Sequence, residues 1–473
     1  MESKKEKRRK EMARELGKDK DGIQKVMRAP DYASDALGQI ALNSISCLAG
    51  QMTFFYTNKM GMAAATVGTV LLIAKIFDAI TDLFMGKIVD KTHTKYGKAR
   101  PWLLRMVIPS MIAIVALFTV PKGAGNFQYI YALLTNIFAS AICYTAIAVP
   151  YYTMMAYKTK SSEEKGKMGT FRSAVGYAIG VGLGIGLIPI TTALGDDQGA
   201  WIKFAVILAI LSGVGLFITF KGSKERFAEE GEEQAKENEV SILKGLGMLV
   251  KNPYWIKITV FGVCMNVMYA MIMAAPIYYA QCIVGDMGFY STINTINLIP
   301  SIIGFLTVGI LINKFGLART AKYASIIGIA GSAVRCIFPS SVPVTLIFGS
   351  VVMYATIPLI SVLPAMVLNT SEVNMKNFGV RITGMTNASN SFVGKIGNGL
   401  GGSAIGWVLA AGGFDAVAAG GEITKGVTTA VYALNIYIPL AMFVIMLIIL
   451  AKYDLEDKMQ ALAAENEAKA ASK

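Results

Sequence analysis

Long apolar segments recur along this chain, and they constrain its fold more than any other feature. We count about twelve of them, each roughly the 20 mostly apolar residues that an α-helix needs to cross a bilayer. The composition agrees, because 54% of the 473 residues are hydrophobic, only 16% are charged and the mean hydropathy is +0.51. The sequence therefore predicts an all-α membrane protein. The segments begin near residues 34, 64, 101, 127, 169, 201, 254, 288, 321, 343, 381 and 425.

A charged stretch in the middle of the chain divides these segments into six and six. Connections elsewhere are short and polar, so this stretch is the natural boundary between two helical bundles. We therefore predict a basic cytoplasmic tail (1–33), a first six-helix bundle (34–221), a central cytoplasmic loop (222–253), a second six-helix bundle (254–452) and a final cytoplasmic tail (453–473).

Basic residues gather in every second connection. The N-terminal tail and the connection around residues 87–100 are rich in Lys and Arg, whereas the connections around 121–125 and 195–198 contain few. Because cytoplasmic loops carry the excess of Lys and Arg, we expect a multi-pass protein of the plasma membrane with both termini in the cytoplasm. The excess of basic residues in these connections accounts for the net charge of +14. We therefore expect the basic regions to face the lipid bilayer, and we expect no nucleic acid as a partner.

Two aspartates, Asp78 and Asp82, stand in the middle of the second apolar segment. A carboxylate at the centre of a membrane helix costs about 2.5–3.5 kcal/mol, so such residues usually mark an ion path, a proton relay or a substrate site. Residues three and four apart share a helix face, which aligns the two acids with Lys75 and sets Thr81 beside them. The spacing predicts a site for a cation. An alternative interpretation is a structural tie between Asp78 and either Lys75 or Lys395.

The identity of that cation stays open. Two carboxylates with hydroxyl or carbonyl oxygens form a hard-oxygen site that suits a small metal ion such as Na⁺. The same pair can instead carry a proton, because two close carboxylates in a low dielectric cannot both ionise cheaply.

A short motif, Gly-x-x-x-Asp/Asn-Lys, occurs at the end of both the second and the eighth apolar segments. Gly86 and Asp90 belong to the first copy, and Gly309 and Asn313 belong to the second. The duplicated motif resembles the loop signature of the major facilitator superfamily. That resemblance implies twelve transmembrane helices in two six-helix halves, which pack around a central site and expose it alternately to the two sides.

A longer block, residues 78–104, resembles a narrower family, the glycoside–pentoside–hexuronide cation symporters that include the melibiose carrier. Shorter matches extend the resemblance over about residues 35–450. It implies a monomer, and it places Gly97 and Arg100 in the loop motif. It also implies a sodium site, whose ligands would be Asp78, Thr81, Asp82 and Thr145.

Substrate recognition departs from the galactoside carriers of that family, which use an acid in the first helix and another in the fourth. The fourth-helix position looks like Ala148 here, and we expect the first helix to offer Gln39 or Asn43 and no carboxylate. Without those acids, the basic residues that remain favour a carboxylate or sulfonate group. The positions that carry over by resemblance are Tyr144, Tyr152, Arg172, Ser391 and Lys395.

We therefore expect an anionic sugar such as a hexuronide or a sulfonated sugar. A neutral glycoside is the alternative, held by polar and aromatic side chains. These are Gln39, Asn43, Asn387, Asn390 and Tyr152.

No sequence motif indicates catalysis. The chain has no phosphate loop of P-loop spacing, no His/Cys metal cluster and no nucleophile beside a base. We expect a secondary transporter with no cofactor besides its coupling ion, which carries a sugar or glycoside across the membrane together with Na⁺ or H⁺ by alternating access. The competing interpretations are a proton-coupled exporter and a sensor of organic solutes that does not transport.

Overall fold

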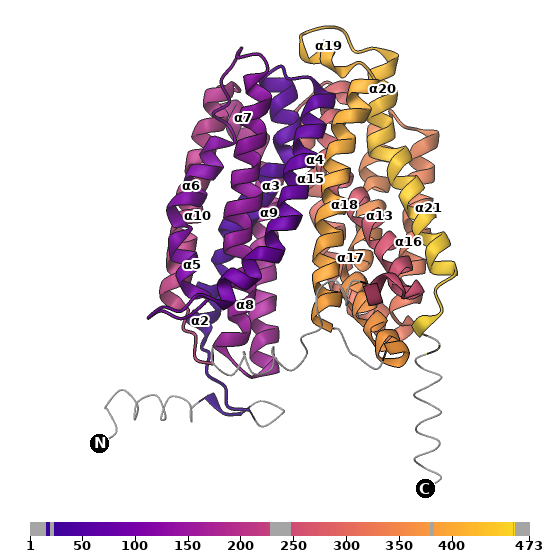
Figure 1. Cartoon of the computed structure of the whole chain (residues 1–473). Coiled ribbons are helices and arrows are strands. Elements are labelled where there is room, and N and C mark those ends of the chain that lie inside the picture. Colours follow the sequence, from indigo (N-terminus) through magenta and orange to yellow (C-terminus); the bar gives the residue numbers. More distant parts are fainter. Residues whose placement is uncertain (1–15, 19–22, 228–246, 379–382, 457, 459–473) are drawn as a thin grey trace, which may run out of the picture. The chain divides into compact units, whose positions relative to one another are not determined.

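The computed structural model describes residues 16–18, 23–227, 247–378, 383–456 and 458. Within these ranges every regular element longer than an isolated β-bridge is a helix, as Figure 1 shows. The chain forms two compact units. Unit 1 comprises residues 1–55 and 73–239, and unit 2 comprises residues 56–72 and 240–473.

Unit 1 contains the helices of the first half of the chain, and three of them join end to end. The helix α7, the π-helix η2 and α8 form one continuous rod over Phe127–Lys158. The elements are α2 (Ala29–Ala36), α3 (Gly38–Phe54), most of α4 (Ala64–Asp90), α5 (Arg100–Arg105), α6 (Val107–Ala116), α7 (Phe127–Asn136), η2 (Ile137–Tyr144), α8 (Thr145–Lys158), α9 (Ser162–Ala193) and α10 (Gln198–Gly222).

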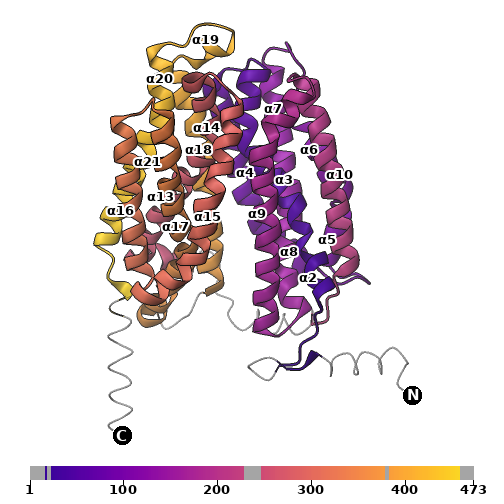
Figure 2. The same cartoon turned by 180° about the vertical axis from the view of Figure 1, so that it is seen from behind.

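Unit 2 contains the remaining helices, which Figure 2 shows from behind. Its core includes the fully buried side chains of Phe261, Met268, Leu359 and Phe443. The elements are η1 (Phe55–Lys59, largely in this unit), α13 (Pro253–Ala274), α14 (Pro276–Tyr279), η3 (Ala280–Val284), α15 (Gly288–Phe315), α16 (Leu317–Ile337), α17 (Val342–Phe378), α18 (Thr383–Ala411), α19 (Phe414–Ala418), α20 (Lys425–Tyr432), η4 (Ala433–Tyr437) and α21 (Ile438–Ala451).

Seven helices in the described part of the chain are long and apolar enough to cross a membrane. They confirm the predicted all-α membrane protein. The remaining predicted segments also coincide with helices, but the total of twelve spans stays a prediction. The seven spans are Phe127–Lys158, Glu163–Ala193, Gln198–Gly222, Pro253–Val284, Gly288–Phe315, Val342–Ser371 and Lys425–Ala451.

The first two turns of α4 belong to unit 2, where they lie against α18. A side chain at Gly68 would come within 2.6 Å of the Ser403 carbonyl oxygen, and one at Gly406 within 2.4 Å of the Ala64 carbonyl oxygen. Small residues therefore let the two backbones approach closely, which is how membrane helices commonly associate. The rest of α4 continues into unit 1 and carries the two aspartates.

In unit 1, a glutamate from beyond α10 caps the start of α5. The Glu225 carboxylate accepts hydrogen bonds from the backbone N–H groups of Lys98, Ala99 and Arg100 at 2.8, 2.9 and 2.5 Å. Gly97 has a φ of +107°, and a Cβ there would lie only 2.4 Å from that carboxylate. The loop therefore requires a glycine at this position.

Unit 2 repeats this arrangement. Glu456, which follows α21, accepts hydrogen bonds from the backbone N–H groups of Leu317 and Ala318 at 2.8 and 2.7 Å. Gly316 has a φ of +81°, and a Cβ there would lie 2.6 Å from Glu456. The internal repeat in the sequence thus extends to a matching helix cap in each unit.

Candidate functional site

The two aspartates of α4 converge with a threonine of α8 inside unit 1. The Thr145 hydroxyl oxygen lies 3.2 Å from Asp78 Oδ1 and 2.8 Å from Asp82 Oδ1. Asp78 is 1% exposed and Thr145 is 2% exposed, whereas Asp82 is half-buried. Three of the four residues predicted to hold the cation therefore bring their side-chain oxygens together. A cluster of carboxylate and hydroxyl oxygens is the donor set that small hard cations prefer.

The fourth predicted ligand, Thr81, makes a different contact. Its hydroxyl donates a hydrogen bond of 3.1 Å to the backbone carbonyl of Asp78, which is a common local bond for threonine in a helix. The structure shows no direct hydrogen bond between this hydroxyl and the carboxylates.

Lys75 supplies a positive charge at this carboxylate cluster. Its Nζ lies 3.2 Å from Asp78 Oδ2, so the ion pair given above as an alternative interpretation is present. The Lys75 side chain is 30% exposed, whereas that of Asp78 is 2% exposed. The ammonium is therefore partly exposed, while the carboxylate stays buried.

The backbone changes its helix type directly before Thr145. The π-helix η2 occupies Ile137–Tyr144, and α8 begins at Thr145. A π-helix holds more residues per turn than an α-helix and often occurs at functional sites. The turn at which η2 ends therefore determines which face of α8 carries Thr145.

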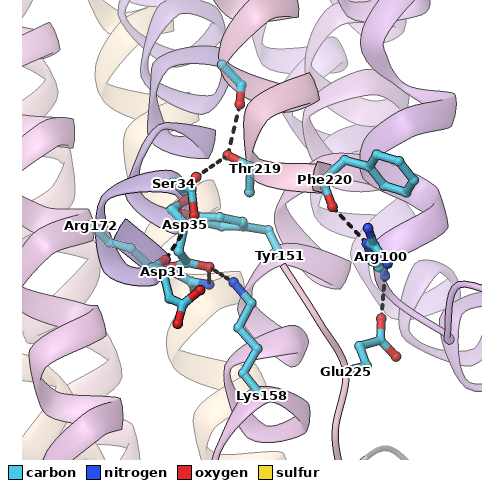
Figure 3. Close-up of polar contacts among 11 residues, drawn as sticks. Asp31, Ser34, Asp35, Arg100, Tyr151, Lys158, Arg172, Thr219, Phe220 and Glu225 are labelled. Carbon is cyan, nitrogen blue, oxygen red and sulfur yellow. Dashed lines mark hydrogen bonds and ion pairs between the residues drawn. The ribbon is translucent and has the colours of Figure 1, made fainter. Parts of the chain in front are cut away.

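A buried carboxylate in the first helix of unit 1 corrects one expectation. Asp35, in α2, is 0% exposed and accepts hydrogen bonds from Arg172 Nε at 2.6 Å and Arg172 Nη2 at 2.9 Å. Lys158 binds the same carboxylate, as Figure 3 shows. The prediction that the first helix offers no carboxylate is therefore wrong. The sequence did contain a signal, because Asp35 precedes Gln39 by four residues and Asn43 by eight, which places all three near one helix face.

This pairing changes the role that Arg172 can play. Its guanidinium stacks at 3.7 Å over the Tyr151 ring, and the side chain is 3% exposed. The remaining nitrogen, Nη1, is buried and finds no acceptor among the residues that the structure describes. Arg172 is thus held by its own unit and is not presented as an open cation. The expectation that it adds a free positive charge to the substrate cavity is not supported in this conformation.

Gln39 and Asn43 form a polar pair on α3. Asn43 Nδ2 donates a hydrogen bond to Gln39 Oε1 at 2.8 Å. Gly176 of α9 lies against them, because a Cβ there would come within 2.9 Å of Asn43 Nδ2 and 3.4 Å of Gln39 Oε1. Tyr152 is 52% exposed and contacts the Tyr151 ring edge-on at 5.6 Å, whereas Tyr144 is half-buried.

The remaining predicted substrate residues lie on α18 in unit 2. Ser391 is exposed and Lys395 is half-buried. The side chains of Asn387 and Asn390 lie outside the described residues. These residues are described within unit 2, and their proposed contact with substrate stays a prediction.

The residues of the loop motif differ in their contacts and in their exposure. Arg100 donates a hydrogen bond from Nε to the Phe220 carbonyl at 2.7 Å and stacks at 4.4 Å over the Phe220 ring. Gly86 and Gly309 lie within α4 and α15. Apart from the helix's own backbone and the two adjacent residues, no atom of the described residues lies within 4 Å of a Cβ added at either position. Asn313 is exposed near the end of α15, and the side chain of Asp90 lies outside the described residues.

The fold and the buried oxygen cluster define a membrane transporter, and comparison with known proteins gives its family. Residues 34–457 match the family described as "MFS/sugar transport protein", where MFS denotes the major facilitator superfamily, and the chain belongs to this family. The matches to known symporters identify it further as a member of the glycoside–pentoside–hexuronide symporters. The predicted family, the major facilitator fold and the prediction of a transporter rather than an enzyme are confirmed.

Several relatives match most of the chain. The isoprimeverose transporter of Lactiplantibacillus pentosus is 28% identical over 392 residues, 80% of each chain. The glucuronide carrier protein homolog of Escherichia coli (strain K12) is 25% identical over 430 residues, 89% of this chain and 92% of that one. The putative sulfoquinovose importer of the same organism is 23% identical over 369 residues, 76% and 77% of the two chains.

Solved structures support the fold. A nucleoside transporter aligns with a TM-score of 0.63 at 13% identity, covering 90% of this chain and 100% of that one. A D-xylose–proton symporter aligns with a TM-score of 0.60 at 14% identity, covering 90% and 97%.

Proposed function

We propose that this protein moves a sugar or glycoside across the membrane together with a cation bound at Asp78, Asp82 and Thr145. The observation that carries the proposal is the convergence of these three side chains, because the Thr145 hydroxyl lies 3.2 Å from Asp78 Oδ1 and 2.8 Å from Asp82 Oδ1. An ion pair with a buried member, such as Lys75–Asp78, rarely stabilises a fold better than apolar packing would. The cluster is therefore better explained by a function than by packing.

Lys75 gives this site a means of responding to the cation. Without a bound cation, the ammonium at 3.2 Å compensates the Asp78 charge. An entering Na⁺ or H⁺ takes over that compensation and releases Lys75 toward solvent. Cation binding is therefore an exchange of one positive charge for another, and the coupling ion is Na⁺ or H⁺ with no other cofactor.

For the substrate, the Arg172–Asp35 pair favours a neutral glycoside. The guanidinium is neutralised within its own unit, which leaves recognition to the amides of Gln39 and Asn43 and to the exposed ring of Tyr152. These groups bind sugar hydroxyls by hydrogen bonds and sugar faces by stacking. A neutral glycoside is also what the name of the isoprimeverose transporter indicates for that relative.

An anionic sugar is the second candidate, and one observation favours it. Two cations, Lys158 and Arg172, share the single Asp35 carboxylate, which leaves this cluster with an excess of positive charge. Two relatives are named for a glucuronide and for sulfoquinovose, both of them acidic sugars.

The proposed cycle is alternating access. Cation and substrate raise one another's affinity, and by thermodynamic necessity this effect is equal in both directions. The empty and the doubly loaded carrier re-orient, whereas the singly loaded carrier does not. We further propose a monomer with both termini in the cytoplasm, on the grounds of the Lys and Arg distribution and the family resemblance.

The test is uptake into proteoliposomes under imposed Na⁺ or H⁺ gradients. The panel contains neutral glycosides, uronides and sulfonated sugars, and the variants are Asp78→Asn and Asp82→Asn. Asp286→Asn is the matched control, since Asp286 lies in an exposed loop of unit 2. We expect one gradient to drive accumulation, and we expect both site variants to abolish it while the control retains it.

Other outcomes identify the competing functions. Outward flux of an organic solute driven by a proton gradient would indicate an exporter. Substrate binding without flux would indicate a sensor. Uptake that is equal in wild type and both site variants would remove the cation-coupling role from the two aspartates.

A further inference from the structure

A second amide pair lies in unit 2, where α13 and α18 meet. Asn398 of α18 donates a hydrogen bond from Nδ2 to Asn266 Oδ1 of α13 at 3.0 Å, and Figure 1 shows the two helices side by side. Asn266 stands near the middle of the apolar span Pro253–Val284. A polar side chain in such surroundings is costly unless it is hydrogen-bonded. Both side chains are half-buried, so part of each amide is accessible.

This pair repeats the bonding pattern of Gln39 and Asn43 in unit 1. Asn43 Nδ2 donates hydrogen bonds to the Gln39 backbone carbonyl, one turn before it, at 3.0 Å and to the Gln39 side-chain oxygen at 2.8 Å. Asn398 Nδ2 likewise donates to the Gly394 backbone carbonyl, one turn before it, at 2.8 Å and to the Asn266 side-chain oxygen. In each unit, one amide nitrogen therefore bonds both a helix carbonyl and a second amide.

A glycine on the neighbouring helix makes room for each pair. In unit 1 a Cβ at Gly176 would lie 2.9 Å from Asn43 Nδ2, and in unit 2 a Cβ at Gly397 would lie 2.6 Å from the Asn266 Cβ. The helices α3 and α13 come from the first apolar segment of their half, and α9 and α18 come from the fifth. The two amide pairs therefore occupy matching positions in the internal repeat.

The Asn266–Asn398 pair retains capacity for further hydrogen bonds. A side-chain amide can donate two hydrogen bonds, and its oxygen can accept two. Within the described part of the chain, Asn398 Oδ1 receives no hydrogen bond, and Asn266 Nδ2 donates only to the Gly262 carbonyl, at 2.7 Å. The pair can therefore offer one acceptor and one N–H donor to a further partner.

Asn398 shares a helix face with two residues that the sequence predicts to contact substrate. Ser391, Lys395 and Asn398 follow one another at spacings of four and three residues, which sets them on one side of α18. Ser391 is exposed, and Lys395 is half-buried like Asn398. The face that carries the predicted substrate residues thus continues to the amide pair.

We propose that Asn398 Oδ1 accepts a hydrogen bond from one hydroxyl of the transported sugar, and that Asn266 holds Asn398 in position. This inference rests on the sugar transport proposed above and extends recognition to unit 2. A site that hydrogen-bonds a substrate hydroxyl rejects the analogue that lacks it, because the polar group of the site is then left unpaired. Asn398 therefore makes the carrier specific for the position of one hydroxyl.

The competing explanation is a structural tie, because side-chain amides commonly hold membrane helices together. The same two helices share another tie of equal length, in which Trp255 Nε1 of α13 donates to Ser389 Oγ of α18 at 3.0 Å. Ser389→Ala removes that bond and is the matched control for Asn398→Ala. A purely structural role predicts that the two variants behave alike.

The experiment measures the KM of equilibrium exchange in proteoliposomes that contain the full-length protein. The probes are methyl glucoside, methyl xyloside and methyl glucuronide, each with its monodeoxy analogues, which lack one ring hydroxyl. Na⁺ and pH are equal on both sides of the membrane. Exchange needs no ion gradient, so the measurement holds even if the cation coupling at Asp78 and Asp82 proves wrong.

Asn398→Ala should raise the KM of a transported probe by about three- to tenfold and leave the maximal rate of exchange unchanged. Wild type should show a higher KM for one monodeoxy analogue than for its parent sugar, whereas Asn398→Ala should not distinguish the two. Asn266→Ala should raise the KM by a smaller factor, because Asn398 Oδ1 remains. Ser389→Ala should keep the wild-type KM and the wild-type preference among the analogues.

Asn398→Gln retains an amide and should recover part of the affinity, which separates a lost contact from a misfolded protein. An equal change of KM in Asn398→Ala and Ser389→Ala would overturn the inference in favour of a tie. Wild-type discrimination against every deoxy analogue in Asn398→Ala, or wild-type KM values in both Asn398→Gln and Asn266→Ala if Asn398→Ala does not fold, would also overturn it. If wild type exchanges none of the probes, the proposed sugar transport and this inference fall together.

Discussion

Arg172 binds Asp35 with two nitrogens: Nε lies 2.6 Å from Oδ2, and Nη2 lies 2.9 Å from Oδ1. Paired donors of this kind fix the geometry as well as the charge of a carboxylate. Because Asp35 is fully buried, the pair ties α2 to α9 inside unit 1. The arginine that the sequence suggested as a receptor for anions is already engaged by a carboxylate of the same unit.

We therefore predict that Asp35→Ala destabilises the protein. It leaves Lys158 and Arg172 buried without their partner, and breaking a buried ion pair in this way costs about 3–5 kcal/mol. Thermal unfolding in detergent should show a lower Tm than wild type. Asp31→Ala is the comparison. Among the described residues, this half-buried acid of the same helix accepts a hydrogen bond only from the Arg28 backbone N–H, at 2.9 Å. Losing such a cap costs about 0.5–2 kcal/mol, so the Tm of Asp31→Ala should fall less. An unchanged Tm for Asp35→Ala would show that the pair does not stabilise unit 1.

Thr145→Val should weaken the binding of the coupling cation and leave folding intact. Valine keeps the shape of threonine but removes the hydroxyl that lies 2.8 Å from Asp82 Oδ1. Loss of one such polar contact costs about 0.5–1.5 kcal/mol, or up to roughly tenfold in affinity. The measurement is the cation concentration that gives half-maximal uptake. Thr153→Val on the same helix, whose hydroxyl bonds only locally to the Val149 carbonyl, should leave that concentration unchanged. Equal effects of the two variants would argue against a ligand role for Thr145.

Replacing Lys75 should have the opposite effect. Lys75→Gln removes the ammonium that lies 3.2 Å from Asp78 Oδ2 and competes with the entering cation. We expect the apparent affinity for the coupling cation to rise by about three- to tenfold. Two unit charges that lie this close to each other near a protein surface interact by a few kcal/mol at most. Lys203→Gln, an exposed position on α10, serves as the control. A fall in affinity would show that Lys75 supports the bound state instead of competing with it.

Gly176→Ala should raise the KM for the sugar. The new Cβ would come within 2.9 Å of Asn43 Nδ2, so the Gln39–Asn43 pair must shift. We expect an increase of about threefold to thirtyfold, the range of one to two lost hydrogen bonds. Gly182→Ala on the same helix has no atom within 4 Å of the added Cβ and should keep the wild-type KM. If both alanines behave alike, the effect comes from helix propensity and not from the polar pair.

The helices and the aspartate pair follow from local patterns in the sequence. Hydropathy over about 20 residues predicts a membrane helix, and a spacing of four residues puts Asp78 and Asp82 on one face. The Arg172–Asp35 pair joins residues 137 positions apart, and the Glu225–Ala99 bond joins residues 126 apart. No helical period relates such distant residues, so their contacts emerge only from the packed structure.

The approach of Thr145 to the aspartates was predictable only in part. The family resemblance implied its role, whereas the residues alone gave no reason to select it. The π-helix η2 that precedes it was not predicted either, because bonds from residue i to i+5 leave no hydropathy period.

The glutamate caps also set an order of events during biosynthesis. The start of α5 is capped by Glu225, 126 residues beyond Ala99, and the start of α16 is capped by Glu456, 139 residues beyond Leu317. Each of these two helices is therefore made long before the residue that caps it. Unit 1 can complete its cap while the helices of unit 2 are still being synthesised, whereas unit 2 can complete its cap only after α21 has been made. The residues that follow α10 and α21 thus decide when each bundle closes.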